Sequence, residues 1–173
     1  MTSYYGQQRP LYVPPSHLDD IRVKLCITTR RTMTVTEPPI SKGIVIFGAT
    51  GDLCKRKLIP ALYNLWKKNL LPHNFVITGS SRRDPGAQAW KESLGDYPEE
   101  FFHQLDYIST DLDNVDTLRH LPDYLHDNTY FLSVPPERYG NAVINLKETG
   151  LLDDPDRSRV VIEKPFGYDY KSA

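Results

Sequence analysis

Cysteine, long apolar runs and an excess of charge are all scarce in this sequence. Only two of its 173 residues are cysteines, Cys26 and Cys54, and their spacing fits neither a disulfide framework nor a metal motif. Free thiols are typical of the reducing cytoplasm, so we predict a cytoplasmic protein. The five histidines are scattered through the chain, and they also predict no metal site.

The scarcity of apolar runs and of net charge argues against a membrane protein and against a nucleic-acid-binding protein. No run approaches the roughly 20 apolar residues of a membrane-spanning helix. The formal net charge of −1 argues against a surface that attracts nucleic acid or a lipid headgroup layer. What remains, 39% apolar and 25% charged residues, is typical of a globular domain with a proper core. We therefore predict neither a nucleic-acid partner nor a membrane partner.

The first 41 residues differ from the rest of the chain. They are polar and interrupted by proline, ending at Pro38 and Pro39, and their short apolar cluster is too charged for a signal peptide. We expect residues 1–41 to be a disordered extension and residues 42–173 to form one domain. One hypothesis is that Met33 is the natural start.

From residue 43 the chain alternates between short apolar runs and helical patterns. The runs predict strands at 44–47, 75–79, 105–109, 129–134 and 159–162, and the intervening patterns predict helices near 55–69, 87–94, 113–121 and 137–149. Such alternation implies right-handed crossovers. The predicted fold class is α/β, a Rossmann-like, doubly wound parallel sheet of about five strands.

Two local details of the helices are predicted as well. Proline costs about 3 kcal/mol inside a helix, so we expect the first regular helix to begin near Pro60, after a looser turn over residues 52–57. Asp113 is the expected N-cap of the helix that carries Leu118.

The most informative stretch is the glycine turn that follows the first strand. Gly48 permits a sharp turn, and Gly51 lets the backbone approach a ligand without a Cβ in the way. Amides of the following helical turn then face an anion, and the Thr50 hydroxyl adds a contact. This arrangement suits the pyrophosphate of a dinucleotide, although a glycine turn that binds nothing is the alternative.

Other unusual residues also follow predicted strands. Ligands of parallel sheets bind outside the carboxyl ends of the strands. The features found there are the glycine turn, Ser80 to Arg83, Thr110 to Leu112, Pro135-Pro136 and Glu163 to Pro165. Their common location predicts one binding site at this edge.

Arg82 and Arg83 occupy the place where NAD-binding sites usually carry an acid for the adenosine ribose. A guanidinium matches a phosphate, so this pair favours the 2′-phosphate of NADP. Asp84 is the competing acid and would serve NAD, and a solvated basic turn is the third possibility.

Two features follow the last predicted strands. Pro135-Pro136 makes a rigid shelf that suits a nicotinamide ring, or it simply ends the strand. Lys164 either pairs with Glu163 or points at the cleft, and its location at a strand end favours the cleft.

Three stretches together resemble glucose-6-phosphate dehydrogenase: G-A-T-G-D-L-C-K-R-K-L-I-P-A-L-Y at 48–63, V-P-P at 134–136 and E-K-P-F-G at 163–167. The resemblance covers residues 43–173. It implies the NADP-dependent oxidation of glucose 6-phosphate to 6-phosphogluconolactone, the first step of the oxidative pentose phosphate pathway. It also implies that the full-length enzyme is a homo-oligomer.

The resemblance assigns roles to individual residues. The coenzyme-binding residues it implies are Gly48, Ala49, Thr50, Gly51, Asp52 and Leu53 at the pyrophosphate, Arg82 at the 2′-phosphate, Asp111 and Leu112 near the adenine, and Pro135 and Pro136 near the nicotinamide. Lys164 would bridge coenzyme and sugar phosphate, with Pro165 shaping that turn. Cys54 lies where the family usually has alanine, and its larger side chain needs slightly more space between the helix and the strand.

The family's catalytic histidine belongs to an R-Y-x-I-D-H-Y-L-G-K motif beyond E-K-P-F-G, and these 173 residues do not contain it. We therefore expect no catalytic residue in this chain, weak NADP binding at most and negligible turnover by it alone, because hydride transfer needs a base for the hydroxyl proton. Two alternatives stay open: an NADP-binding module without activity, and a sugar dehydrogenase of the glucose-fructose oxidoreductase type.

Overall fold

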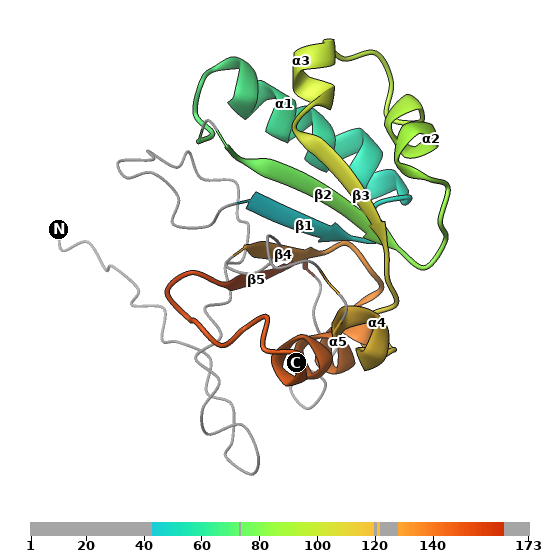
Figure 1. Cartoon of the computed structure of the whole chain (residues 1–173), viewed down its shortest axis with the longest axis vertical. Helices are drawn as coiled ribbons and strands as arrows, with labels where there is room; N and C mark the ends of the chain where they lie inside the picture. The colour runs from blue at the N-terminus through green and yellow to red at the C-terminus, as the bar shows by residue number, and fades with distance from the viewer. Residues whose placement is uncertain (1–42, 73, 120, 122–127, 165–173) are drawn as a thin grey trace, which may run out of the picture.

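A five-stranded parallel sheet forms the centre of the domain (Figure 1). The computed structural model describes residues 43–72, 74–119, 121 and 128–164. The strands are β1 (Gly43–Phe47), β2 (Val76–Ser81), β3 (Leu105–Ser109), β4 (Thr129–Leu132) and β5 (Arg159–Ile162), in the order β3-β2-β1-β4-β5. The predicted Rossmann-like α/β class is confirmed. The predicted disordered extension and the hypothesis about Met33 fall outside the described residues.

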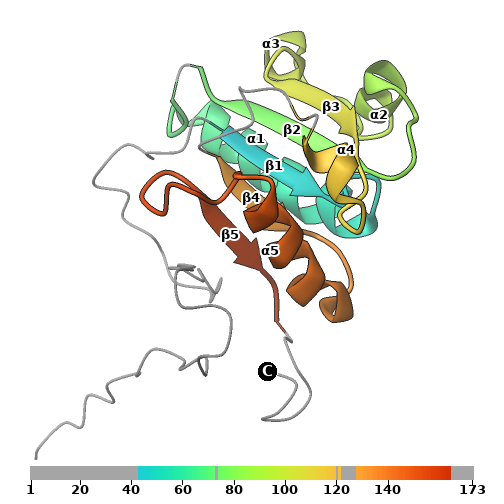
Figure 2. The same cartoon turned by 60° about the horizontal axis from the view of Figure 1, so that its bottom comes forward.

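Helices cover both faces of this sheet (Figures 1 and 2). The helical segments are η1 (Cys54–Leu58), α1 (Ile59–Lys67), α2 (Ala87–Glu92), α3 (Glu99–Phe102), α4 (Val115–Arg119), η3 (Pro136–Arg138) and α5 (Tyr139–Glu148). Segments α1, α2 and α3 lie on one face, and α4 and α5 lie on the other. Within the described residues, no helix combines the length and the apolar character needed to span a bilayer.

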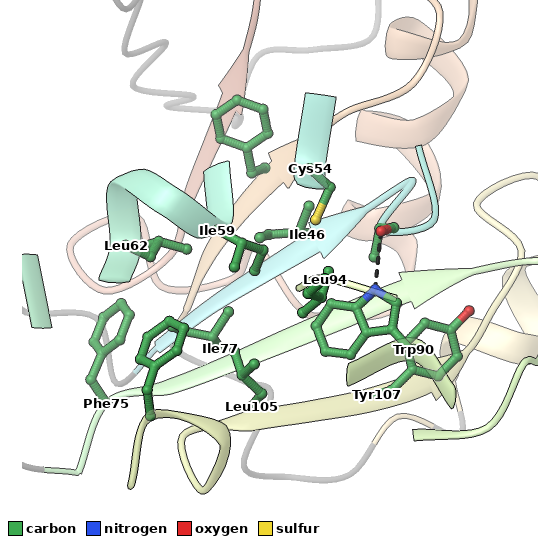
Figure 3. Packing of buried hydrophobic residues seen from close by; sticks show 13 residues of the cluster. Ile46, Cys54, Ile59, Leu62, Phe75, Ile77, Trp90, Leu94, Leu105 and Tyr107 are labelled. Atoms are coloured by element: carbon green, nitrogen blue, oxygen red, sulfur yellow. Dashed lines mark hydrogen bonds between the residues drawn. The ribbon is translucent and has the colours of Figure 1, made fainter. Parts of the chain in front are cut away.

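Two apolar clusters fill the space between the sheet and its two helical layers. Successive strand residues point to opposite faces, so Val45 and Phe47 join the cluster under α4 and α5 while Ile46 joins the one under α1 and α2. Figure 3 shows the second cluster, where Ile59 from α1 and Trp90 from α2 pack on the sheet. Burial on both faces explains the continuous apolar run of β1.

The helix after β1 begins with wide turns. Residues 54–58 form a π-helix, in which the Ile59 amide donates to the Cys54 carbonyl, and the regular α1 begins at Ile59 with Pro60 in its first turn. A proline ring clashes with the carbonyl four residues earlier in a regular α-helix, and the wider turn relieves that contact. The late start of the regular helix is confirmed, and the looser segment before it is itself helical.

Three predicted boundaries need correction. Strand β2 runs two residues further than predicted, to Ser81, and β4 stops at Leu132, before Ser133 and Val134. The cap of α4 is Asn114, whose side-chain oxygen accepts the Asp116 amide at 3.1 Å. Asp113 is not the cap, because its carboxylate pairs with Arg138 instead.

All five carboxyl ends lie at one edge of the sheet. Phe47 pairs with Ser80 on one side and with Leu132 on the other, and Leu132 in turn pairs with Ile162. Strand β1 lies between β2 and β4, so the connections diverge on its two sides, and such a switch point is the usual ligand crevice of open α/β sheets. Gly48 and Lys164 consequently follow strands at the same edge.

Candidate functional site

A cleft of about 390 Å³ opens at this switch point. Its lining comes from the segments that follow β1, β2, β3 and β4. The lining residues are Phe47, Gly48, Thr50, Gly51, Ser80, Ser81, Arg82, Arg83, Thr110, Asp111, Leu112, Ser133, Val134, Pro135 and Arg138. Four of the five strand ends singled out in the sequence therefore meet in one cavity.

The glycine turn forms one wall of the cleft. Gly48 has φ +87°, and a Cβ there would lie 2.1 Å from the Ser133 carbonyl oxygen, so only glycine fits. The amides of Gly48 and Ala49 donate to the Ser80 carbonyl at 2.8 and 3.0 Å, which fixes the turn to β2.

Some amides of this turn remain available to a ligand. Within the described residues, the backbone amides of Thr50, Asp52 and Leu53 donate to no backbone carbonyl. The amide of Gly51, in contrast, donates to the Gly48 carbonyl at 3.0 Å. Free amides at the start of a helix, next to a glycine without a Cβ, attract and admit an anion.

Trp90 supports the glycine turn from beneath. Its indole Nε1 donates to the Ala49 carbonyl at 3.1 Å (Figure 3), and the side chain is only 1% exposed. The ring lies against Gly79, where a Cβ would come within 2.5 Å of it. Trp90 thus ties α2 to the turn, a role that no local pattern in the sequence indicated.

The segment after β2 carries the two arginines and is held by hydroxyl groups. The Tyr107 hydroxyl donates to the Arg83 carbonyl at 2.5 Å, and the Ser81 hydroxyl lies 2.7 Å from the Tyr107 oxygen and 2.9 Å from the same carbonyl. Burial raises the pKa of Tyr107, so its donor proton is retained at neutral pH. The backbone is therefore held at Arg83, and both Arg82 and Arg83 line the cleft.

Asp84 is the acid that could bind the adenosine ribose of NAD, but its carboxylate makes a hydrogen bond within its own turn. Its Oδ1 accepts the Gly86 amide at 2.9 Å, which closes a short turn, and Asp84 is not among the lining residues. Arg82 and Arg83 therefore make the cleft wall after β2 cationic.

Arg138 is a lining residue that sequence reasoning missed. Its Nη2 lies 3.3 Å from Asp111 Oδ1 and also pairs with Asp113 Oδ2, which joins the start of α5 to the segment after β3. Asn145 of α5 donates to the Leu112 carbonyl at 2.6 Å and adds a second tie. No local signal indicates Arg138, because its partners lie 25 and 27 residues away in the sequence.

Comparison with known proteins gives the family. Residues 45–173 match the family model described as glucose-6-phosphate dehydrogenase, NAD binding domain. The chain belongs to the glucose-6-phosphate dehydrogenase family. The match also supports a nicotinamide dinucleotide as the coenzyme of this domain, and it disfavours the glucose-fructose oxidoreductase alternative.

Curated relatives of this family cover the same region. The chain is 40% identical over 152 residues to glucose-6-phosphate 1-dehydrogenase of Aggregatibacter actinomycetemcomitans, which is 75% of this chain and 31% of that protein. It is 36% identical over 155 residues to the enzyme of Streptococcus pneumoniae, again 31% of that protein. The chain thus spans about a third of the length of these dehydrogenases.

Solved structures of the same family share the fold. Glucose-6-phosphate 1-dehydrogenase from Mycobacterium avium matches with a TM-score of 0.62 and 32% identity, over 77% of this chain and 32% of that one. A glucose-6-phosphate dehydrogenase in complex with its substrate glucose-6-phosphate matches with a TM-score of 0.67 and 25% identity, over 82% and 34%.

The structure brings most of the residues that the resemblance implied into the cleft. Those that line it are Gly48, Thr50, Gly51, Arg82, Asp111, Leu112 and Pro135. Ala49 is buried under the turn, Leu53 packs against the cluster beneath it, and exposed Asp52 lies 3.8 Å from Arg56.

The remaining implied residues lie outside the cleft lining. Pro136 begins η3, and Lys164 is exposed at the same sheet edge beyond β5. Burial raises the pKa of Tyr139, and the backbone of Glu163, the residue before Lys164, partly offsets that rise. Pro165 lies outside the described residues.

Cys54, the departure from the dehydrogenase pattern, is a core residue. It is 0% exposed and packs in the cluster under α1. Burial raises the pKa of its thiol from 9.0 to about 12, so it is neutral and chemically inert at physiological pH. The fold therefore accommodates the larger side chain away from the cleft.

Proposed function

We propose that this chain is the NADP-binding part of a dehydrogenase that oxidises glucose 6-phosphate to 6-phosphogluconolactone. NADP+ suits the cleft because the free amides of the glycine turn can bind its pyrophosphate, and the cationic residues Arg82 and Arg83 can bind its 2′-phosphate. When bound, the coenzyme supplies the hydride acceptor. As in the sequence-based division, residues 42–173 form the coenzyme domain.

The observation that carries the coenzyme choice is the arrangement after β2. Arg82 and Arg83 both line the cleft, whereas the carboxylate of Asp84 accepts the Gly86 amide within its own turn. An NAD site would present a carboxylate to the adenosine ribose at this point. We assign Arg82 as the principal ligand of the 2′-phosphate. The hydrogen bonds to the neighbouring Arg83 carbonyl keep the Arg82 backbone in place.

Two observations support the proposed sugar substrate: the family of the chain, and the position of Lys164 at the carboxyl edge of the sheet. A related dehydrogenase structure holds glucose 6-phosphate. Lys164 lies beyond β5 at the edge where the coenzyme binds, and its ammonium can serve the sugar phosphate together with Pro165. We infer a cytoplasmic enzyme that is homo-oligomeric when full-length. Turnover by these 173 residues alone is expected to be negligible.

The test is the coenzyme selectivity of the Arg82→Ala variant. The dissociation constants of NADP+ and NAD+ are measured by calorimetry on the 173-residue chain. Hydrogen bonds to a charged group contribute about 1.5–3 kcal/mol, so we expect the NADP+ constant to rise by roughly 10- to 100-fold. The NAD+ constant should stay within about twofold, because NAD+ has no 2′-phosphate.

Arg157→Ala is the matched control. Arg157 lies just before β5, at the amino edge of the sheet, so its removal deletes the same charge far from the cleft. Its NADP+ affinity should equal that of the wild type. Equal loss of NADP+ binding in both variants, or an unchanged NADP+ preference in Arg82→Ala, would refute the assignment.

A further inference from the structure

Arg138 lines the cleft with part of its guanidinium unused. The side chain is only 21% exposed, and both of its ion pairs are made through Nη2. Within the described residues, Nη1 and Nε contact no acceptor, which leaves three N–H donors at a mostly buried cation. Among the described residues no side-chain nitrogen is both buried and without a hydrogen-bond partner, so these donors are accessible and can bind a ligand in the cleft that Arg138 lines.

The place of Arg138 in its helix points the same way. It is the residue before α5 begins at Tyr139, and a cation is unfavourable at the amino end of a helix. Asp111 and Asp113 offset this charge and hold the guanidinium in one orientation. An arginine that lines the cleft, is oriented by two carboxylates and keeps unpaired donors is suited to bind a phosphate.

We propose that Arg138 is a further coenzyme-binding residue, which contacts the pyrophosphate that NADP+ and NAD+ share. The inference rests on the proposed function, and it assigns Arg138 a role different from that of Arg82. Arg82 distinguishes the two coenzymes through the 2′-phosphate, whereas Arg138 strengthens the binding of both. Asp111 and Asp113 act as positioning residues, because both pair with Nη2 and fix the orientation of the guanidinium.

The test compares Arg138→Met with Asp113→Asn in the full 173-residue chain. Methionine keeps the aliphatic stem, so the packing survives while the donors are lost. We expect Arg138→Met to weaken NADP+ and NAD+ alike, each by about tenfold or more, with the ratio of the two constants unchanged within twofold. Asp113→Asn breaks one of the two ion pairs that position Arg138 but keeps every donor, so we expect a clearly smaller loss than in Arg138→Met, again equal for the two coenzymes.

A second variant keeps the test usable if Arg138→Met does not fold. Arg138→Lys retains the charge that the two carboxylates need but loses the planar fork, so both coenzymes should bind several-fold more weakly. Thermal unfolding of each variant confirms that a folded protein is being compared.

Each outcome separates this inference from the proposed function. Wild-type affinity in Arg138→Lys or Arg138→Met would overturn the role of Arg138 alone. Equal losses in Arg138→Met and Asp113→Asn would make the ion pair structural, and a loss confined to NADP+ would move Arg138 to the 2′-phosphate; either result overturns the proposal. A wild-type chain that binds NAD+ as tightly as NADP+ would instead refute the coenzyme choice of the proposed function.

Discussion

Replacing Tyr107 by phenylalanine removes one atom from the support of the arginine segment. The Tyr107 hydroxyl donates to the Arg83 carbonyl at 2.5 Å and lies 2.7 Å from the Ser81 hydroxyl. The ring itself packs on Trp90, with centroids 5.3 Å apart, and phenylalanine preserves that contact. The substitution therefore tests the hydroxyl alone.

The expected magnitude follows from the two contacts that the hydroxyl loses, one with the Arg83 carbonyl and one with the Ser81 hydroxyl, a loss that Ser81 offsets in part. A hydrogen bond contributes about 0.5–1.5 kcal/mol net, and Ser81 continues to serve the Arg83 carbonyl at 2.9 Å. We expect the free energy of unfolding to fall by about 1 kcal/mol. The NADP+ dissociation constant should rise by roughly 2- to 10-fold, because part of the binding energy is then needed to order Arg82. NAD+ binding should change less.

Trypsin provides a readout that needs no ligand. It cleaves after arginine, and cleavage after Arg82 and Arg83 requires that segment to leave its hydroxyl support. We expect Tyr107→Phe to be cut there several-fold faster than the wild type, as measured by mass spectrometry of the first fragments. Tyr97→Phe is the control, since Tyr97 contacts other aromatic rings away from the cleft.

Two results would refute this reasoning. One is an unchanged cleavage rate after Arg82 and Arg83 together with unchanged coenzyme constants in Tyr107→Phe. The other is an equal acceleration in Tyr97→Phe, which would attribute the effect to general destabilisation rather than to the hydroxyl.

The remaining predictions concern a glycine and a thiol. Gly48→Ala should lower the free energy of unfolding by about 3 kcal/mol, because the new Cβ meets the Ser133 carbonyl and the left-handed backbone is strained. Gly95→Ala, with φ +106° and no atom within 4 Å of the added Cβ, should lower it by only about 1 kcal/mol in the same urea titration. Cys54 has a folded-state pKa of about 12 against 9.0 for a free thiol, so its contribution to stability should be constant below pH 9 and fall as pH rises from 9 towards 12. Urea midpoints of the wild type and Cys54→Ala across that range measure this contribution; parallel curves would contradict it.

The sheet was predictable because its signals are local. Strand β5 has the predicted bounds, and so does β3, since each is a short apolar run with turn residues after it. The glycine turn was also visible, because Gly48 and Gly51 interrupt an otherwise regular pattern. The positions of these strand ends at one edge then follow from parallel topology alone.

The missed features depend on contacts between distant parts of the chain. Asp113 and Asn114 are both good capping residues, and the choice between them is made by Arg138, which takes the Asp113 carboxylate from 25 residues away. Tyr107 and Trp90 are ordinary core aromatics by sequence. Their polar atoms reach the cleft backbone only because β3 and α2 pack where they do.

The close contact between Gly79 and Trp90 means that a substitution beneath the cleft can disturb the glycine turn. Any side chain at position 79 would displace the indole that lies within 2.5 Å of its Cβ position, and the indole in turn holds the Ala49 carbonyl. A substitution in the middle of β2 can therefore abolish nucleotide affinity while every residue in the cavity wall keeps its identity. Screens for inactive variants should accordingly recover changes at Gly79 together with those at the arginines.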